Sequence, residues 1–206
     1  MNAVPDDAAS PTLVLATRNA HKVGELTEIL GPLLGGAVLQ PLPDTAPDPV
    51  EDGETFEANA LLKARSAVAA TGLPALADDS GIAVDALGGA PGIHSARYAG
   101  TRDDRDNYEL LLRRLEGVAD RTAAFVCAAA YVHPDGTELV EVGRWPGRVL
   151  EAPAGEHGFG YDPVFQPDDA TVASAELTAA EKNARSHRTR AFTALLPAAL
   201  AHLRGA

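Results

Sequence analysis

The stretch Thr12-Leu13-Val14-Leu15-Ala16-Thr17-Arg18-Asn19-Ala20-His21-Lys22 decides the fold class. Its first five residues form an apolar run of strand length, and beyond Lys22 the apolar residues recur at helical spacing. These residues are Val23, Leu26, Ile29, Leu30 and Leu33. A short buried strand that leads directly into a helix is the building unit of α/β proteins, so this stretch predicts an α/β fold.

The rest of the chain continues the alternation of strand-like and helix-like segments. Further strands are expected at residues 37–42, 76–77, 82–87, 122–132 and 137–145. Further helices are expected from about Thr55 to Ala70, after Asp103 or Asp104, and from Thr178. The last two strands flank the turn His133-Pro134-Asp135-Gly136 and predict an antiparallel hairpin. We therefore predict a mixed central sheet flanked by helices, in one two-lobed domain over residues 11–206 that follows a loose tail over residues 1–10.

Composition narrows the functional classes. The chain has 206 residues, a net charge of −12 and a single cysteine, Cys127, within an apolar run. One cysteine excludes an intrachain disulfide, no apolar run approaches the roughly 18 residues that span a bilayer, and the acidic start lacks the features of a signal peptide. We expect a cytoplasmic protein that binds neither membrane nor nucleic acid, in which any anionic ligand is held by a local cluster of cations.

The segment Ala77-Asp78-Asp79-Ser80-Gly81 places two adjacent carboxylates after a short apolar run. A carboxylate pair at a strand end can bind Mg²⁺ or take a proton from water. Adjacent side chains of an extended strand point to opposite faces, so the two aspartates are expected to have different roles. Gly81 is expected to permit the turn that exposes them. A solvated acidic turn is the alternative interpretation.

Three polar residues, Thr55, Asn59 and Lys63, recur every fourth position on the helix predicted after Thr55. Such a row can face a cleft, although a solvated helix face would give the same pattern. Near the C-terminus, Thr178-Ala179-Ala180-Glu181 has the pattern of a capping box and predicts a helix start. Lys182 lies in the first turn of that helix.

Lys182, His187 and Arg188 bring three cationic or potentially cationic groups together in an acidic chain. On one continuous helix they would point apart, whereas a break with Ser186 as a new N-cap would let them converge. The alternative is a basic helix end that complements the helix dipole. Upstream, the glycine-rich loop over residues 155–163 can present Phe159 as a stacking surface for a base, or use it as a core anchor.

Six motifs occur in this order along nearly the whole chain, from about residue 12 to residue 204. They are Thr17-x-Asn19-x-x-Lys22, Thr55-Phe56-x-x-Asn59-Ala60-x-x-Lys63-Ala64, Ala77-Asp78-Asp79-Ser80-Gly81, Gly88-Gly89-Ala90-Pro91-Gly92-Ile93-His94-Ser95-Ala96-Arg97-Tyr98, Phe159-Gly160-Tyr161-Asp162-Pro163 and Ser186-His187-Arg188. Together they resemble the Ham1 family of non-canonical purine nucleoside triphosphate pyrophosphatases. The chain departs from the family at Ala58, where many relatives carry a glutamate, and Glu57 lies one position earlier.

The resemblance implies a homodimer of two-lobed α/β subunits, with the nucleotide in the cleft between the lobes and Mg²⁺ as cofactor. It implies hydrolysis of ITP, dITP and XTP to the monophosphate and pyrophosphate, which cleanses the nucleotide pool. It also implies that Glu51 is a second acidic metal ligand, although an ordinary acidic loop would explain that residue as well.

The residue chemistry supports this reaction independently. A triphosphate carries about four negative charges, so an acidic chain can hold it only through Mg²⁺ and concentrated cations. The loop over residues 17–22 joins a strand to a helix, and its backbone N–H groups can cradle phosphate oxygens. The predicted phosphate-binding and substrate-binding residues are Thr17, Arg18, Asn19, Ala20, His21, Lys22, Lys63 and Ser80.

Asp79 is the predicted general base and metal ligand, which deprotonates the water that attacks phosphorus while pyrophosphate leaves. Asp78 and Asn59 are expected to support it. At the other end of the nucleotide, Phe159 is expected to stack on the purine. The remaining residues predicted to bind the base are Gly160, Tyr161, Asp162, Lys182, His187 and Arg188.

Three other functions remain open from the sequence. A non-enzymatic nucleotide-binding regulator would use the same phosphate cradle without needing Asp79. A phosphomonoesterase with an aspartyl nucleophile would release orthophosphate. A Maf-type pyrophosphatase would prefer pyrimidine or modified nucleotides, and it is disfavoured because the Phe159-Gly160-Tyr161-Asp162 and Ser186-His187-Arg188 motifs match the purine family.

Overall fold

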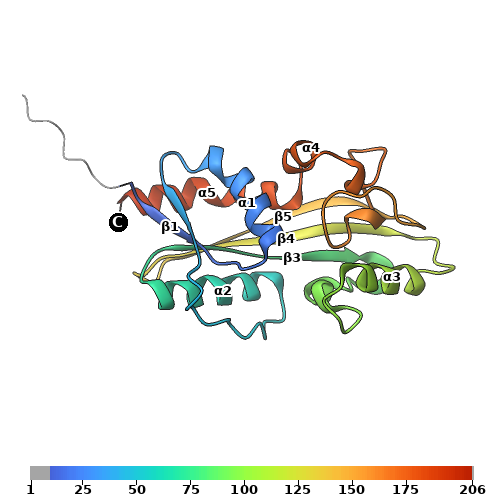
Figure 1. Ribbon diagram of the computed structural model, residues 1–206, viewed down its shortest axis with the longest axis horizontal. Coiled ribbons are helices and arrows are strands. Elements are labelled where there is room, and N and C mark those ends of the chain that lie inside the picture. Colours follow the sequence, from blue (N-terminus) through green and yellow to red (C-terminus); the bar gives the residue numbers. More distant parts are fainter. Residues whose placement is uncertain (1–9, 206) are drawn as a thin grey trace, which may run out of the picture.

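The computed structural model describes residues 10–205, and a six-stranded mixed sheet forms its centre (Figure 1). The strands are β1 (Thr12–Leu15), β2 (Val38–Pro41), β3 (Ala75–Val84), β4 (Thr122–Val132), β5 (Glu138–Val149) and β6 (Phe165–Pro167). Their order is β2-β1-β3-β4-β5-β6. β1 runs parallel to β2 and β3, and the other neighbours are antiparallel. The predicted α/β class and mixed sheet are confirmed. Apart from Ser10, the predicted tail lies outside the described residues.

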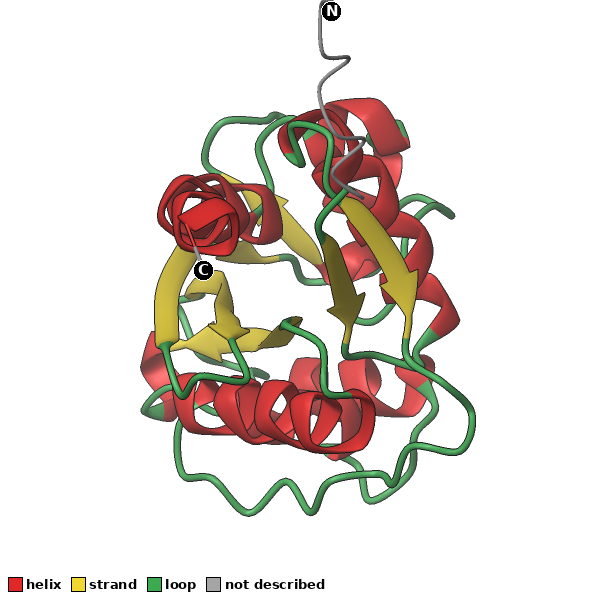
Figure 2. Ribbon diagram, turned by 90° about the vertical axis from the view of Figure 1, so that its left-hand side faces the viewer, coloured by secondary structure: helices red, strands yellow, loops and turns green. Residues whose placement is uncertain are grey.

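Helices cover both faces of the sheet (Figures 1 and 2). They are α1 (Ala20–Leu30), α2 (Phe56–Thr71), α3 (Asp104–Arg114), α4 (Ala179–Asn183) and α5 (His187–Gly205). α2 and α3 lie on one face, and α1, α4 and α5 lie on the other (Figure 1). Within the described residues no helix is both long enough and apolar enough to cross a membrane.

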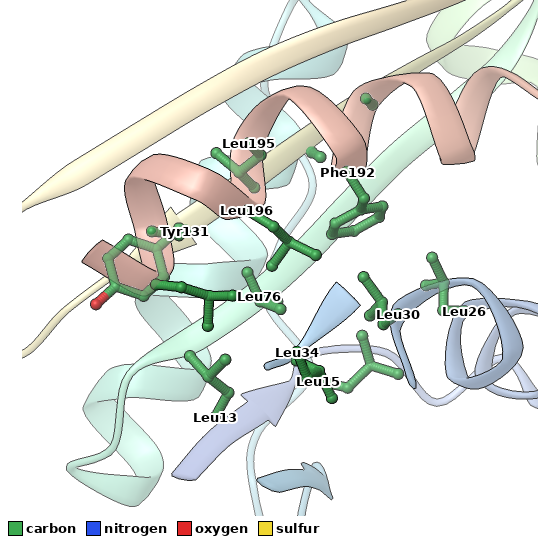
Figure 3. Packing of buried hydrophobic residues seen from close by; sticks show 14 of the residues in the cluster. Leu13, Leu15, Leu26, Leu30, Leu34, Leu76, Tyr131, Phe192, Leu195 and Leu196 are labelled. Atoms are coloured by element: carbon green, nitrogen blue, oxygen red, sulfur yellow. The ribbon is translucent and has the colours of Figure 1, made fainter. Parts of the chain in front are cut away.

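The apolar core consists of three clusters. The first joins α1 and α5 to β1, β3 and β4 through large side chains such as Leu26, Leu76 and Phe192 (Figure 3). The second packs the small residues Ala60 and Ala64 of α2 against the opposite face of the same strands. The third fills the far end of the sheet, beneath α3.

β3 passes through both ends of this core. Residues 75–77 belong to the first two clusters, and Ile82 and Val84 belong to the third. The polar residues Asp78, Asp79 and Ser80 lie between them, on a strand whose ends are apolar and buried. The carboxylate pair therefore lies in the middle of a strand that is anchored in the core at both ends.

The turn predicted at Gly81 is wrong. β3 continues through Gly81 without interruption and pairs with β4 along its whole length, and regular strand structure ends at Val84 rather than at residue 87. A Cβ atom at Gly81 would collide with Ser95 Oγ and the Gly92 carbonyl of the 3-10 helix Gly92–Arg97. The glycine is thus required for close packing of that helix against the strand.

The predicted helix ends and the hairpin are confirmed. Thr55 caps α2 and Gly72 ends it in the left-handed conformation, with φ of 68°. Thr178 and Glu181 form a capping box on α4. α5 begins directly after Ser186, whose Oγ accepts from the Thr189 N–H, so the helix break predicted there exists.

Candidate active site

The candidate site lies where the parallel strand β1 ends beside β3. Leu15 is paired with Leu76, and the Ala16 N–H donates to the Leu76 carbonyl at 2.7 Å. The loop that follows β1 is thereby brought next to Asp78 and Asp79. Ligands of α/β proteins bind outside the carboxyl ends of parallel strands, so this junction is a natural position for a ligand site.

Asp78 points to the face that α1 and α5 cover, and its side chain is fully buried. Lys22 Nζ on α1 donates to its Oδ2 at 2.8 Å, Ser80 Oγ donates to the same oxygen at 3.0 Å, and Arg188 Nε on α5 lies 3.5 Å away. Burial alone would raise the pKa of Asp78, but the charges of Lys22 and Arg188 outweigh it, so the pKa lies well below its usual range. Asp78 is therefore a buried anion held through Oδ2, whereas its Oδ1 has no hydrogen-bond partner among the described residues.

Asp79 points to the opposite face, toward α2, and 10% of its side chain is exposed. Lys63 Nζ donates to Asp79 Oδ1 at 2.6 Å and to the Asp78 carbonyl at 3.1 Å, and Asn59 Nδ2 donates to Asp79 Oδ2 at 3.5 Å. Burial raises the pKa of Asp79, and Lys63 offsets this rise only in part. Asn59 and Lys63, predicted as one polar row, therefore face the site rather than solvent.

Glu51 lies on the same side as Asp79. Its Oε2 is 3.3 Å from Lys63 Nζ, and 39% of its side chain is exposed. Burial would lower the pKa of Lys63, but the carboxylates around it raise the value, so the ammonium stays charged. Two carboxylates that share one cation also offer oxygen ligands to a divalent metal ion.

The loop over residues 17–22 caps its own helix. Asn19 Oδ1 accepts from the N–H groups of His21 and Lys22 at 3.0 and 3.3 Å, and Thr17 Oγ1 accepts from the Asn19 N–H. Arg18 points away from the acid pair and bonds to Asp48 and to the Ala46 carbonyl. The structure thus brings Asn19 and Lys22 to the site but not the Arg18 guanidinium.

A second group of charges lies on the α1 and α5 side, around the buried carboxylate of Glu25. Arg188 Nη1 lies 3.2 Å from Glu25 Oε1, and Lys182 Nζ lies 3.7 Å from Glu25 Oε2. Arg188 Nη2 also donates to Ser80 Oγ at 2.9 Å. Burial would raise the pKa of Glu25, but the two cations lower it. The helix break at Ser186 therefore does bring Lys182 and Arg188 together.

Asp162 anchors the glycine-rich loop to this group. Its carboxylate accepts from Lys182 Nζ at 2.6 Å, from Ser174 Oγ at 2.8 Å and from the Phe159 N–H at 2.9 Å. Gly158 has a φ of 78°, and a Cβ atom there would collide with the Asp162 carboxylate. Asp162 thus holds Lys182 and the loop in place.

Phe159 lies over the two cations. Lys182 Nζ is 5.0 Å and Arg188 Cζ is 5.1 Å from the centre of its ring, which also stacks on His21 at 5.5 Å. By contrast, Tyr161 is buried, and its hydroxyl donates to the Ser95 carbonyl at 2.8 Å. Tyr161 is thus fixed by the core, whereas Phe159 packs on charged side chains.

His187 completes this part of the site. It is buried, its ring stacks on Phe125 at 4.9 Å, and its Nδ1 has no hydrogen-bond partner among the described residues. Burial holds the pKa of His187 well below its usual value, so the ring is neutral. A neutral imidazole nitrogen without a partner is available to bind a polar edge of a ligand.

A cavity of about 110 Å³ lies between these residues. Its lining includes Lys22, Ser80, Phe159, Lys182, His187 and Arg188. Two wider cavities, of about 570 and 630 Å³, adjoin the same loop, and Phe159 lines all three.

Sequence reasoning missed Glu25 and Phe125. Glu25 follows Lys22 at helical spacing, so the two side chains share one face of α1, but the partner Arg188 is 163 positions away. Phe125 stands in an apolar strand, where nothing separates a residue that supports the His187 ring from an ordinary core residue. The spacing to Lys22 was the one local signal for Glu25.

Comparisons with known proteins agree on one family. Residues 13–198 match the Ham1 family. A dITP/XTP pyrophosphatase from Streptomyces coelicolor is 54% identical over 194 residues, which cover 90% of this chain and 95% of the relative. A second one, from Corynebacterium efficiens, is 49% identical and covers 94% of this chain and 99% of the relative.

Solved structures give the same result. The structure of a HAM1 protein from Coxiella burnetii superposes with a TM-score of 0.82 and 40% identity, and covers 95% of this chain and 100% of that chain. A nucleoside-triphosphatase, or dITP/XTP pyrophosphatase, from Mycobacterium abscessus superposes with a TM-score of 0.73 and 47% identity. It covers 91% of this chain and 98% of that chain.

Proposed function

The chain belongs to the Ham1 family, and we propose that it hydrolyses the non-canonical purine nucleoside triphosphates ITP, dITP and XTP to the monophosphate and pyrophosphate. The curated relatives bear the name dITP/XTP pyrophosphatase and match the chain over nine tenths of its length. One observation carries the proposal from the structure. Asp79, a buried carboxylate with a raised pKa, lies in the middle of β3, and the other side of that strand holds a cationic pocket.

The phosphates would bind on the side of β1 and α2. Lys22 and Lys63 are the cations nearest the two aspartates, and Asn19 lies at the N-terminus of α1, where the helix dipole favours an anion. In the ligand-free protein both ammonium groups bond to aspartates. A triphosphate would compete for Lys22 and Lys63, which frees the Asp79 carboxylate for the reaction.

Asp79 would act as the general base. Its carboxylate accepts a proton from water as the water oxygen bonds to the α-phosphorus, and the bond from that phosphorus to the pyrophosphate oxygen breaks. A carboxylate whose pKa is raised by burial accepts a proton more readily than an exposed aspartate. Asp78 would stay ionised and would hold Lys22 and Arg188 in place.

We propose Mg²⁺ as the cofactor, with Asp79 and Glu51 as its protein ligands. The donor set fits, because both carboxylates already lie within 3.3 Å of one cation, the Lys63 ammonium. When bound, Mg²⁺ neutralises phosphate charge and lowers the pKa of a bound water. The cluster of three potential metal ligands, His133, Asp135 and His202, lies elsewhere in the described part of the chain, so this assignment rests on Asp79 and Glu51 alone.

The base would bind on the other side of β3. Lys182 and Arg188 offer hydrogen-bond donors to the C6 oxygen of inosine or xanthine, whereas adenine carries an amino donor there and would accept no hydrogen bond from them at that position. The free Nδ1 of His187 would supply a further contact. Guanine shares the C6 oxygen, so its rejection has to come from its C2 amino group and should be less complete.

Phe159 has to shift for the base to enter. The cavity of about 110 Å³ is smaller than the roughly 300–1,000 Å³ typical of small-molecule sites. A purine that stacks on Phe159 would displace either His21 or the two cations from its ring. Because Phe159 lines the wider cavities as well, its movement would join them to the base pocket.

We also propose that the protein is a cytoplasmic homodimer. The resemblance to the family supports dimerisation, and light scattering of the purified protein tests it.

The net charge of −12 argues against binding to nucleic acid. The single cysteine, Cys127, is buried, and burial raises the pKa of its thiol, as expected for an inert core residue.

The deciding experiment is product identification. Purified protein is incubated with ITP, dITP, XTP, GTP, ATP and a pyrimidine triphosphate in the presence of Mg²⁺, and both products are identified. We expect pyrophosphate and the monophosphate from ITP, dITP and XTP, and little turnover of ATP. Orthophosphate alone would indicate a phosphomonoesterase, a preference for pyrimidines would indicate a Maf-type enzyme, and binding without turnover would indicate a regulator.

A further inference from the structure

A cluster of two histidines and one aspartate lies at the end of the sheet away from the acid pair. His133 and Asp135 belong to the turn between β4 and β5, and His202 lies in the last turn of α5. Each offers one ligand atom, and these atoms all lie within 4.8 Å of one another. The cluster therefore joins two segments that are far apart in the chain.

Hydrogen bonds already orient the three side chains. Asp135 Oδ1 accepts from the Thr137 N–H at 2.8 Å and lies 3.0 Å from His133 Nδ1. His202 Nε2 lies 3.2 Å from Asp135 Oδ2. The other nitrogen of that ring, Nδ1, lies 3.2 Å from the hydroxyl of the buried Tyr131. A partner on the second ring nitrogen is the usual way in which proteins fix a metal-binding histidine.

The charges also suit a cation. Asp135 supplies a carboxylate between the two imidazole rings, 3.0 Å from His133 Nδ1 and 3.2 Å from His202 Nε2. Both histidines are partly exposed, so an ion can reach them from solvent. Two imidazole nitrogens and one carboxylate suit Zn²⁺ and its neighbours in the first transition series, whereas Mg²⁺ prefers oxygen ligands.

We propose that His133, Asp135 and His202 form a binding site for a divalent transition-metal ion such as Zn²⁺, which ties the β4–β5 turn to the C-terminal end of α5. The site is separate from the acid pair. Asp79 pairs with Ala128 on β4, five residues before His133, which corresponds to roughly 17 Å along a strand. Water would complete the coordination, because the described residues supply three ligands.

The test uses tag-free protein stripped of metal with a chelator and titrated with Co²⁺, read by its visible absorption, and with Zn²⁺, read by competition with a dye. We expect one equivalent to bind to the wild type at pH 7.5. His202→Ala and His133→Ala should each weaken binding by at least about 100-fold, and Tyr131→Phe by about 10-fold, since partners of metal ligands contribute about 10- to 100-fold in affinity.

Two control variants distinguish binding at this site from binding to metal-binding side chains elsewhere in the chain. His94→Ala removes an exposed histidine elsewhere and should leave binding unchanged. Glu51→Gln alters the proposed Mg²⁺ site and should also leave it unchanged. Zn²⁺ should raise the melting temperature of the wild type but not that of His202→Ala.

The proposal is overturned if the wild type takes up no Zn²⁺ at micromolar concentrations, or if His202→Ala and His133→Ala bind it as tightly as the wild type does. Circular dichroism establishes that the variants fold. Should an alanine variant not fold, Asp135→Asn carries the same test, because asparagine keeps an oxygen acceptor for the Thr137 N–H and loses the charge. Unchanged affinity in Asp135→Asn would likewise overturn the site.

Discussion

The two sides of β3 at Asp78 and Asp79 differ sharply, although the residues are adjacent. On the Asp78 side, α1 and α5 supply Lys22 and Arg188, and the carboxylate is fully buried with a lowered pKa. On the Asp79 side, α2 supplies one cation, Lys63, and the amide of Asn59, the carboxylate keeps some exposure, and its pKa is raised.

We propose that this difference separates a structural charge, Asp78, from a reactive one, Asp79. A buried carboxylate that is ionised more easily than in the unfolded chain adds to the free energy of unfolding, whereas one that is ionised less easily subtracts from it. The ionised carboxylate of Asp78 therefore adds to the stability of the fold, whereas ionisation of Asp79 opposes it. Groups that cost stability in a cleft are the ones that a fold keeps for function.

The largest effect is expected from Asp78→Asn. The substitution leaves Lys22 and Arg188 buried without their carboxylate, and breaking a buried pair costs about 3–5 kcal/mol. Urea denaturation measures the loss. Asp85→Asn, at an exposed position just beyond β3, is the matched control and should change the free energy of unfolding by less than about 0.5 kcal/mol. If Asp78→Asn were as stable as the wild type, the Asp78 carboxylate would not be needed to compensate the charges of Lys22 and Arg188.

Arg188→Ala is expected to act on selectivity. A hydrogen bond to a charged group contributes about 1.5–3 kcal/mol, so the ratio of ITP to ATP turnover should narrow by about 10- to 100-fold. Both rates are measured on one preparation, so any loss of folded protein cancels from the ratio. An unchanged ratio with lower overall activity would assign Arg188 to the phosphates or to the Asp78 network.

Glu51→Gln is expected to have a smaller effect on the Asp79 side. Glu51 is 39% exposed and would be the weaker of two metal ligands. We therefore expect kcat/KM for ITP to fall by about 10-fold and the Mg²⁺ concentration needed for half-maximal activity to rise. Asp52→Asn removes an exposed charge from the adjacent position and serves as the control. Equal losses in both variants would point to the general acidity of this loop rather than to a ligand.

The smallest effect is expected in the pH dependence of stability. The pKa of Asp78 is lower in the folded chain, so its stabilisation is present above the unfolded value of about 3.9 and is lost as the pH falls toward the folded value. The loss caused by Asp78→Asn should therefore shrink below about pH 4. The pKa of Asp79 is raised in the folded chain, so its effect on the free energy of unfolding should change with pH in the opposite direction. If the free energies of unfolding of Asp78→Asn and Asp79→Asn, each relative to the wild type, changed in the same direction with pH, the distinction between the two carboxylates would be contradicted.

The sequence predicted the parts of the site that depend on local patterns. Strand periodicity placed Asp78 and Asp79 on opposite faces, and Ser186 marked the break that brings Lys182 and Arg188 together. Capping patterns gave the starts of α2 and α4. Each of these features is set by neighbours within a few residues, which is why it can be read from one chain.

The remaining features depend on contacts between distant segments. Gly81 has the composition of a turn but lies within a strand, because the 3-10 helix Gly92–Arg97 packs against it. Arg18 has the position of a phosphate ligand but bonds to Asp48. Glu25 gains its importance from Arg188 on another helix. No local pattern carries this information.

The most direct test of the account is the free energy of unfolding of Asp79→Asn, measured on a preparation whose ITP turnover is known. The account predicts that turnover falls by at least about 10²-fold, as for loss of a general base, while the loss of stability stays well below that of Asp78→Asn, because Lys63 keeps Glu51 as a partner. Near wild-type turnover would show that Asp79 is not the base. A loss of stability as large as in Asp78→Asn would show that the two carboxylates share one structural role.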